Sequence, residues 1–326
     1  MRYLNPSDIR QALSYEEMMA AVEEAFLLFA QGQCAMADRS ALTQGATTLA
    51  TMPCFAGGYA ATKLLASCPD NPRRGLPSLY GTVLLSQGDT GQPVALLEGN
   101  TLTALRTGAI GGLAAKHLAR EDTATAGLVG CGVQGLHQLT FLCQVRPIRT
   151  VYLYNHDSKD LGPFCRQLEA MVAPKPLAIE TCPDPDTLLA KSDIVVTATP
   201  AKAPLFANDP APFRGKCLIA IGSWQPDMRE IPEAIWSATR EVFLELPFAC
   251  QESGDLCQPL ASGALKPEGL RYFGDYLLAK QADAAPPLPH TRYFKSVGMA
   301  VFDAIAARNV RDMALKPGDR SNYELE

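Results

Sequence analysis

The sequence has little that would direct it to nucleic acid or to a membrane. Its 326 residues include 29 lysines and arginines against 34 aspartates and glutamates, a net charge of −5, whereas a non-specific nucleic-acid binder needs a basic face. No apolar run approaches the ~18 residues that cross a bilayer. The start, MRYLNPSDIRQ, lacks the basic and apolar regions of a signal peptide. We therefore expect a cytoplasmic protein with neither a nucleic-acid nor a membrane partner.

Motifs for metal binding and for covalent catalysis are also lacking. The four histidines lie far apart, and none of the ten cysteines forms a C-x-x-C pair. Scattered cysteines without a secretion signal are typical of reduced thiols. The sequence contains no zinc motif, no Walker sequence and no serine nucleophile elbow. We expect no metal site, and an anionic ligand would have to be held by a few placed cations.

What the sequence does contain is a complete dinucleotide fingerprint at 123–135, TATAGLVGCGVQG. An apolar run ends at Gly130, and Gly132 and Gly135 complete the G-x-G-x-x-G pattern before a helical stretch begins. The three glycines allow a tight turn, a close approach to pyrophosphate, and close packing of helix on strand. Free N–H groups at the start of the helix then attract phosphate. We interpret this stretch as a nucleotide-binding βαβ unit; the alternative is an ordinary α/β turn.

The residues after this fingerprint predict a doubly wound parallel sheet, an α/β fold of the Rossmann type, because strand and helix patterns alternate. Residue 155, where a ribose-reading side chain is expected, is Asn155. Residues 259–292 are predicted to be irregular. The strands are expected at 125–130, 150–155, 193–198, 216–221 and 241–246, with helices near 133–145, 158–171, 185–191 and 230–238.

The chain before the fingerprint has a different pattern, which predicts an α+β domain. A helix is expected over 7–33, antiparallel strands over 36–97, and a second helix over 101–118 with Asn100 as its cap. The last helical pattern, 296–307, follows the nucleotide fold. The simplest arrangement builds the first domain from both chain ends, as 1–119 with 298–326, around a dinucleotide-binding domain at 120–297.

Three cations of the α+β part are candidates for holding an anion. Lys63 interrupts the apolar run AATKLLAS, and Arg106 lies on a helix of small and apolar residues, with no carboxylate nearby in either segment. Arg39 precedes a predicted strand. An enclosed cation needs an anionic partner, and arginine suits bidentate carboxylate binding. The alternative for each residue is a surface position or an ordinary salt bridge.

Taken together, these residues resemble the ornithine cyclodeaminase/mu-crystallin family over nearly the whole chain. The resemblance implies a homodimer formed through the first domain, a Rossmann domain, and a small-molecule α-amino or α-imino acid substrate. The matching segments, beside Arg39 and Lys63, are PDNPRRGLPSLYG (69–81), ALLEGNTLTALRTGA (95–109), GCGVQG (130–135), IGSWQPDMREI (221–231) and FKSVGMAVFDA (294–304).

The resemblance also implies roles for individual residues. Arg39, Lys63 and Arg106 would hold the substrate carboxylate, and Val297 would border the substrate. The residues expected at the cofactor are Ser78, Arg106, Thr107, Gly130, Gly132, Val133, Gln134, Asn155, His156, Thr197, Gly222 and Ser296.

One departure from the family bears on the reaction. Cyclodeaminases carry an acidic residue in a G-G-D-x-P-G-K loop, and here Trp224 takes its place in GSWQPDMRE. Asp227 is a neighbour rather than an aligned substitute. This loop is closer to that of ketimine reductases, so we expect reduction of Δ1-pyrroline-2-carboxylate or Δ1-piperideine-2-carboxylate to L-proline or L-pipecolate. The alternatives are a cyclodeaminase that releases ammonia from ornithine, and a binding protein with little turnover.

The second departure concerns the cofactor. NAD-type relatives carry Asp at the position of Asn155, and a carboxylate there would repel a 2′-phosphate. Asn155 removes that repulsion and His156 can add positive charge, so NADPH is slightly favoured over NADH. Lys63, or water held near it, is the expected proton donor and the one catalytic residue assigned.

Overall fold

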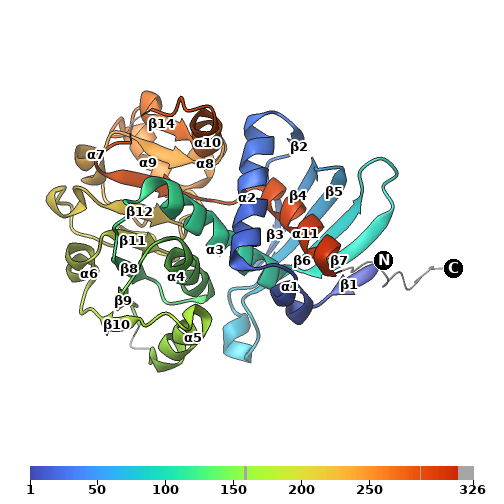
Figure 1. Ribbon diagram of the computed structural model, residues 1–326, viewed down its shortest axis with the longest axis horizontal. Coiled ribbons are helices and arrows are strands. Elements are labelled where there is room, and N and C mark those ends of the chain that lie inside the picture. The colour runs from blue at the N-terminus through green and yellow to red at the C-terminus, as the bar shows by residue number, and fades with distance from the viewer. Residues whose placement is uncertain (158–159, 287, 315–326) are drawn as a thin grey trace. The chain divides into compact units, whose positions relative to one another are not determined.

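The computed structural model describes residues 1–157, 160–286 and 288–314, which form two compact units (Figure 1). The first unit comprises 1–106 together with residues from 299 onward, and the second comprises 107–298. The first unit is therefore built from both ends of the chain. The boundary predicted at 119/120 falls instead between Arg106 and Thr107, inside the helix α3 (Gly99–Leu118).

The first unit contains a seven-stranded sheet. Its neighbours β4 (Thr47–Ala56), β5 (Tyr59–Ser67), β6 (Leu79–Gln87) and β7 (Pro93–Glu98) are antiparallel, as the alternating apolar runs predict. Two short strands, β2 (Cys34–Met36) and β3 (Ser40–Gln44), pair with β4, and β1 (Arg2–Leu4) pairs in parallel with β7. A 3-10 turn, η1 (Asn71–Arg74), precedes β6.

Helices cover one face of this sheet. Both α2 (Tyr15–Ala30) and α11 (Ala300–Ala314) lie on that face (Figure 1), and α11 packs against β4, β5 and α2. The helix predicted over 7–33 is broken in two, with α1 spanning Pro6–Ala12. The break occurs because Ser14 caps α2: its hydroxyl accepts a hydrogen bond from the Glu17 N–H, and the Glu17 carboxylate accepts one from the Ser14 N–H.

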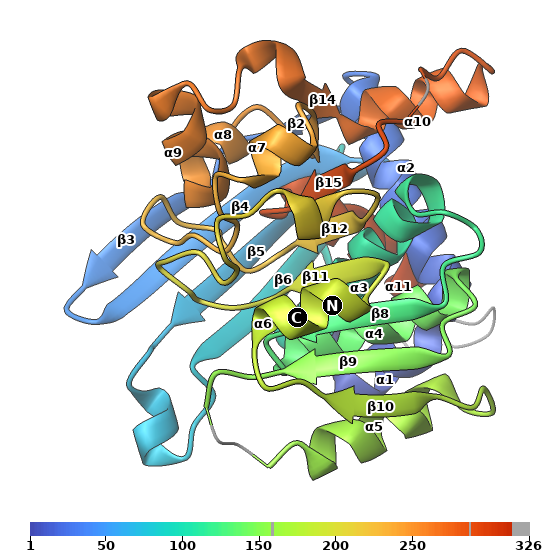
Figure 2. The same ribbon diagram turned by 90° about the vertical axis from the view of Figure 1, so that its left-hand side faces the viewer.

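The second unit is a Rossmann fold with an eight-stranded, fully parallel sheet in the order β10-β9-β8-β11-β12-β15-β13-β14. Figure 2 shows α6 on one face of the sheet and α4 and α5 on the other. The elements run β8 (Thr125–Val129), α4 (Val133–Val145), β9 (Thr150–Tyr154), α5 (Gly162–Val172), β10 (Ala178–Thr181), α6 (Pro185–Lys191), β11 (Ile194–Thr197), β12 (Cys217–Ala220) and β13 (Val242–Leu244).

The irregular region predicted at 259–292 is the main error in the fold. It contains the end of α9 (Gly254–Ser262), then β14 (Leu270–Tyr272), α10 (Phe273–Gln281) and the start of β15 (Arg292–Lys295). These strands have only three or four residues, so their stability comes from parallel neighbours rather than from a local pattern. The helix predicted at 230–238 shortens to α7 (Ile235–Ala238), and α8 (Ala249–Glu252) was not predicted.

The small residues of α3 bring α4 close to it. A side chain at Gly108 would lie 2.6 Å from the Phe141 ring, and one at Gly111 would overlap the Gln138 amide.

The predicted cap of α3 is wrong, because Glu98 accepts hydrogen bonds from the backbone N–H groups of Asn100 and Thr101. Although α3 has 20 residues, no helix in the described part of the chain is long and apolar enough to span a membrane.

Candidate functional site

The second unit gathers most of the predicted cofactor residues at one edge of its sheet. Because all eight strands are parallel, the residues that end or follow them share the carboxyl edge, where open α/β sheets bind ligands. Those residues are Gly130, Gly132, Val133 and Gln134 after β8, Asn155 and His156 after β9, Thr197 at the end of β11, Gly222 after β12, and Ser296 after β15.

The fingerprint glycines have the geometry of a phosphate cradle. Gly130 has a φ of 102°, which L side chains rarely adopt. A Cβ at Gly135 would lie 2.4 Å from the Gly130 carbonyl oxygen, so α4 could not pack as closely on β8 with a side chain there. A Cβ at Gly132 would meet no atom within 4 Å. Gly132 therefore leaves open space on the side where a pyrophosphate would approach.

The start of α4 also fits a bound dinucleotide. Gly132 is the N-cap and provides no side-chain cap, so the first N–H groups of α4 remain available to an anion. Val133 is 65% exposed in spite of its apolar side chain. The Gln134 Oε1 is buried and has no hydrogen-bond partner in the described part of the chain. A nucleotide over this turn would cover the valine and could satisfy the amide.

Asn155 is tied to the same turn. Its Oδ1 accepts a hydrogen bond of 2.8 Å from the Cys131 N–H, and its Nδ2 donates to the Asp157 carboxylate. Both ends of the amide are thus engaged, while His156 and Asp157 are exposed. The ribose-reading position therefore has a carboxylate beside it that the sequence interpretation did not use.

Thr197 and Gly222 are held by one buried carboxylate, that of Glu230. Glu230 accepts hydrogen bonds from the Thr197 hydroxyl at 2.8 Å and from the Gly222 N–H at 2.9 Å. It also accepts from Thr199 and from the Ser223 N–H. Burial raises the pKa of Glu230, and the charge of Asp255 raises it further. Glu230 thereby joins the ends of β11 and β12; it ends the loop GSWQPDMRE, but the sequence analysis assigned it no role.

A second buried carboxylate, Glu245, holds the segment after β15 in the same way. It accepts hydrogen bonds from the Ser296 hydroxyl, from the Val297 N–H at 2.9 Å and from the Gly298 N–H at 2.7 Å. Ser296 and Val297 are buried, so this contact fixes the backbone of both predicted site residues.

In the first unit, Lys63 and Arg106 converge on a carboxylate that the sequence interpretation missed. Lys63 Nζ lies 2.9 Å from Asp303 Oδ1, and Arg106 Nε lies 3.2 Å from the same oxygen. All three side chains are nearly inaccessible to solvent. Asp303 lies 240 residues after Lys63, so the absence of a nearby carboxylate along the sequence did not mean its absence in the fold.

The electrostatics of Lys63 place Arg39 in the same cluster. Burial lowers the pKa of Lys63 to about 8, and the positive charges of Arg106 and Arg39 act in the same direction. The charge and the hydrogen bond of Asp303 oppose them. Burial also raises the pKa of Asp303, but Arg106 and Lys63 bring it below its usual value. The positive charges of Lys63, Arg106 and Arg39 thus act on one another around the Asp303 carboxylate.

The remaining predicted residues are exposed or make other contacts. Ser78 is exposed in the loop before β6 of the first unit. Thr107 is buried on α3, and its carbonyl accepts a hydrogen bond from Gln138 Nε2. In the loop after β12, Trp224 is 36% exposed and Asp227 pairs with the exposed Lys202 at 2.7 Å. In the described part of the chain, no His, Cys, Asp and Glu side chains group in a way that could hold a metal ion.

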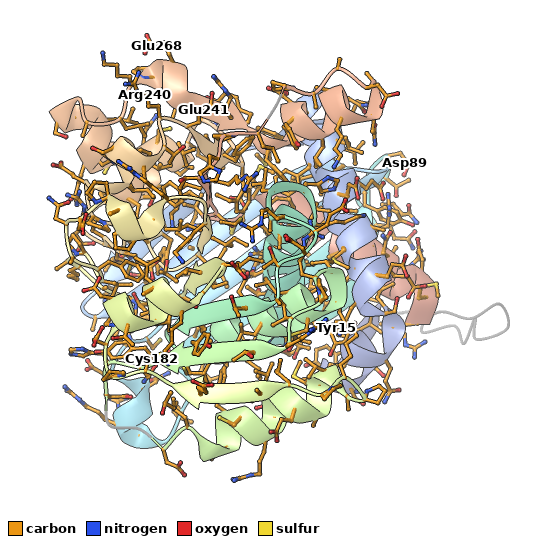
Figure 3. All side chains as sticks on the ribbon, turned by 60° about the vertical axis from the view of Figure 1, so that its left-hand side comes forward. Tyr15, Asp89, Cys182, Arg240, Glu241 and Glu268 are labelled. Carbon is orange, nitrogen blue, oxygen red and sulfur yellow. The ribbon has the colours of Figure 1, made fainter. Side chains whose placement is uncertain are left out.

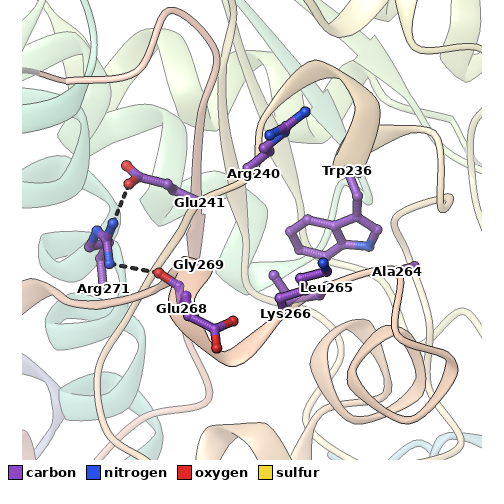
Figure 4. Close-up of a pocket in the computed structure, with 9 residues that line it drawn as sticks. All are labelled: Trp236, Arg240, Glu241, Ala264, Leu265, Lys266, Glu268, Gly269 and Arg271. Carbon is purple, nitrogen blue, oxygen red and sulfur yellow. Dashed lines mark hydrogen bonds and ion pairs between the residues drawn. The ribbon is translucent and has the colours of Figure 1, made fainter.

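A pocket of about 530 Å³ in the second unit lies at a different place from the cofactor edge. Figure 3 shows Arg240, Glu241 and Glu268 near one another, and Figure 4 shows them with Trp236 and Arg271 around this pocket. Arg240 and Glu241 precede β13, and Glu268 precedes β14, so the pocket lies at the amino ends of these strands. Arg271 is paired with Glu241. We therefore exclude this pocket from the cofactor site.

Comparisons with known proteins agree with this architecture. The model of the ornithine cyclodeaminase/mu-crystallin family matches residues 3–318. The chain belongs to this family. A Delta(1)-pyrroline-2-carboxylate reductase from Bacillus thuringiensis subsp. konkukian is 32% identical over 281 residues, 85% of each chain.

Two solved structures are similar over nearly the whole chain. The Delta(1)-pyrroline-2-carboxylate reductase of Thermococcus litoralis, in complex with NADH and L-proline, has a TM-score of 0.88 and 29% identity, and covers 96% of this chain and 97% of its own. An archaeal alanine dehydrogenase dimer with bound NAD has a TM-score of 0.85 and 27% identity, and covers 96% and 95%. The predicted Rossmann fold is thus confirmed.

Proposed function

We propose that this protein catalyses the NAD(P)H-dependent reduction of a cyclic ketimine carboxylate to the corresponding L-imino acid. The substrates are Δ1-pyrroline-2-carboxylate or Δ1-piperideine-2-carboxylate, and the products L-proline or L-pipecolate. One observation carries the proposal: a single oxygen of Asp303 binds Lys63 and the Nε of Arg106. In the described part of the chain this leaves both terminal nitrogens of Arg106 without a hydrogen-bond partner.

The reaction class follows from the family and its named members. The protein is an oxidoreductase that uses a nicotinamide cofactor, like the Thermococcus litoralis reductase, which was solved in complex with NADH. The carboxyl edge of the second unit fits this cofactor, because Gly132 leaves room for pyrophosphate and the Gln134 Oε1 has no hydrogen-bond donor in the described part of the chain. Bound there, the cofactor supplies a hydride.

The three cations give the substrate its orientation. The Arg106 guanidinium presents two parallel N–H donors to a carboxylate, which is the strongest geometry for this pair. Lys63 and Arg39 add positive charge beside Arg106, and Asp303 is the carboxylate that contacts Lys63 and Arg106. The negative charge of a substrate carboxylate is attracted to these cations. Binding a small imine by its carboxylate fixes the position of the carbon of its C=N bond. Such orientation can lower the activation barrier by several kcal/mol.

Lys63 provides the proton that the chemistry needs. A C=N bond accepts a hydride at carbon far better when its nitrogen carries a proton, and the product amine retains that proton. A pKa of about 8 leaves Lys63 protonated at neutral pH yet able to give up a proton. A substrate that arrives as an iminium ion needs only the charge and orientation that the cluster supplies. Val297, whose N–H donates to Glu245, is the further residue that the family resemblance assigns to the substrate.

Two other functions compete with this one, and a single assay separates the three. The cyclodeaminase reaction is disfavoured because Trp224 replaces the acidic loop residue and Asp227 is paired with Lys202. We expect steady NAD(P)H oxidation with Δ1-pyrroline-2-carboxylate and one proline formed per cofactor consumed. Ammonia release from ornithine without net cofactor use would support the lyase. Tight cofactor binding without turnover of any imine would support a binding protein.

We propose NADH as the preferred cofactor, in place of the NADPH that the sequence slightly favoured. The sequence favoured NADPH because Asn155 does not repel a 2′-phosphate, but Asn155 donates a hydrogen bond to the exposed Asp157 carboxylate. A carboxylate at this place accepts a hydrogen bond from the ribose 2′-OH and repels a 2′-phosphate. NADH bound to the Thermococcus litoralis reductase agrees with this preference.

Asp157→Asn is expected to shift the preference toward NADPH. Two like charges about 4 Å apart at a solvated surface repel each other by about 1 kcal/mol, so the NADPH-to-NADH ratio of kcat/KM should rise roughly fivefold. Asp160→Asn, the same change at a neighbouring exposed residue, should leave the ratio unchanged. A wild-type enzyme that prefers NADPH, or an Asp157→Asn variant with the wild-type ratio, would contradict this assignment.

The open face of the first sheet supports a homodimer. The four strands β3 to β6 contain one charged residue, Lys63, and its side chain is buried. Large apolar side chains are exposed on these strands, including Leu42 at 74%, Phe55 at 56% and Leu64 at 42%. An uncharged patch of this kind is typical of an interface, and the archaeal alanine dehydrogenase is a dimer. A second copy of this chain is therefore the expected occupant.

Leu64→Arg is expected to convert the dimer to a monomer. The substitution places a charge among apolar side chains near the middle of β5, where an interface would bury it unpaired. Light scattering after size-exclusion chromatography measures the mass directly. Met313→Arg, at a 51% exposed position on α11, should remain dimeric. A dimeric Leu64→Arg variant would show that this face is not the interface.

A further inference from the structure

Asp303 is the least explained residue of the carboxylate-binding cluster. It lies near the start of α11 with 1% of its surface exposed, and it meets cations from two distant elements, Lys63 on β5 and Arg106 on α3. Both cations use the same oxygen, Oδ1. The other oxygen, Oδ2, is buried and has no hydrogen-bond partner in the described part of the chain.

This geometry differs from that of an ordinary structural ion pair. Carboxylates that only stabilise a fold normally satisfy both oxygens, and a fork-to-fork contact would use the terminal nitrogens of arginine. Asp303 contacts Arg106 from the side, through Nε. The contact fixes the plane of the guanidinium and leaves its two terminal nitrogens available.

The charges around Lys63 are unequally distributed. Asp303 on α11 faces it together with Arg106 on α3 and Arg39 between β2 and β3. Cys54 on β4 also lies close enough to Asp303 for the carboxylate to raise the pKa of its thiol. Of these groups, Asp303 is the one that favours the charged form of Lys63, through its charge and its hydrogen bond.

We propose that Asp303 is a positioning residue for the substrate: it holds Lys63 as an ammonium ion and fixes Arg106 by its Nε, so that a substrate carboxylate meets a preformed pair of donors. This inference rests on the proposed function, because it assigns the cluster to a carboxylate ligand. Asp303 acts through the two cations and does not touch the substrate.

The direction of the pH dependence follows from the same contacts. Lys63 has a pKa of about 8, and it attracts an anion by its charge only while it is protonated, so its contribution to anion affinity is full below that pH and is lost above it. Removing the Asp303 charge removes the larger of the two effects by which Asp303 raises the pKa of Lys63, while burial, Arg106 and Arg39 still lower it. The loss of affinity must then begin at a lower pH.

The test measures binding of pyrrole-2-carboxylate to the NADH-loaded enzyme by titration calorimetry from about pH 6 to about pH 10. This ligand is a planar ring carboxylate without a group of its own that titrates in this interval. For the wild type, Kd should be constant at low pH and rise about tenfold per pH unit above the pKa of Lys63. For Asp303→Asn, the rise should start at lower pH, so that affinity near pH 8 is at least about tenfold weaker.

The same variant should approach wild-type affinity at about pH 6, because acid restores the charge of Lys63. Loss of structure alone would weaken binding equally at every pH. Asp303→Glu keeps the charge and should return the pH midpoint toward that of the wild type. Asp312→Asn, the same change at an exposed residue of α11, should match the wild type throughout.

The possible failures are distinguishable. If the wild type binds pyrrole-2-carboxylate but Asp303→Asn has the same pH midpoint, the positioning role is overturned and the proposed function stands. If the wild type binds neither this ligand nor L-proline, both are overturned. If circular dichroism shows that Asp303→Asn does not fold, the wild type and Asp303→Glu provide the test. The proposal is overturned if the wild type does not lose ligand affinity at high pH. It is also overturned if the pH midpoint of Asp303→Glu differs greatly from that of the wild type.

Discussion

Replacing Arg106 with alanine is expected to lower kcat/KM for Δ1-pyrroline-2-carboxylate by roughly 30- to 3,000-fold. Truncating one partner of a buried, hydrogen-bonded charge pair costs about 2–5 kcal/mol, and each 1.4 kcal/mol is about tenfold. The variant loses the two terminal donors proposed for the substrate, and it also removes one of the two cations that contact Asp303, so that Lys63 remains. Most of the effect should appear as a higher KM, because the contact with the substrate carboxylate is made both in the bound ground state and in the transition state.

Two measurements make this result specific. NADH affinity, followed by quenching of protein fluorescence, should change far less than kcat/KM, because the phosphate cradle lies in the second unit. Arg10→Ala removes an exposed arginine from α1 of the first unit and should leave kcat/KM unchanged. Unchanged turnover in Arg106→Ala would remove Arg106 from the substrate site.

The second large effect is expected for Gly132→Val, which should bind NADH at least about 100-fold more weakly while remaining folded. A side chain at Gly132 meets no protein atom within 4 Å, and the backbone φ of −99° is accessible to any residue. The added methyl groups therefore occupy the space through which a pyrophosphate must approach the backbone. Surface substitutions of this kind usually change stability by less than about 0.5 kcal/mol.

Gly135→Val provides the contrast. Its Cβ would lie 2.4 Å from the Gly130 carbonyl oxygen and 2.8 Å from Leu128. This substitution is expected to lower the melting temperature as well as cofactor binding, because α4 cannot keep its packing on β8. A Gly132→Val variant that binds NADH like the wild type would show that the dinucleotide does not cross this turn.

Local sequence patterns were sufficient for the nucleotide fold. The fingerprint 130–135 requires glycine at each position for a geometric reason, and those reasons are visible in the φ of Gly130 and the close approach at Gly135. The capping box at Ser14 likewise marks the true start of α2. Both features depend on residues within a few positions of one another, so the sequence displays them directly.

Contacts between distant segments could not be predicted in the same way. Asp303 pairs with Lys63 across 240 residues, and nothing in either segment indicates the other. One signal was available, because Asp303 interrupts the apolar helix pattern VGMAVFDAIAA as Lys63 interrupts its own. The strands β14 and β15 were missed for a related reason, since three or four residues gain their stability from neighbours in the sheet.

Buried carboxylates are a common feature of the residues that position this site. Glu230 joins the ends of β11 and β12, Glu245 holds the backbone after β15, and Asp303 holds two cations. Each accepts several hydrogen bonds, which compensates for the cost of burying its charge. These carboxylates contact the predicted site residues rather than a ligand, and a search for ligand-binding motifs therefore assigns them no role.

The fate of the hydride tests the central claim most directly. NADH deuterated at both C4 positions should be consumed in equal amount to the Δ1-pyrroline-2-carboxylate that disappears. Mass spectrometry and NMR should find L-proline with a single deuterium at its α-carbon, and no ammonia should be released. Proline without deuterium, or cofactor that remains reduced while ammonia accumulates from ornithine, would contradict the account.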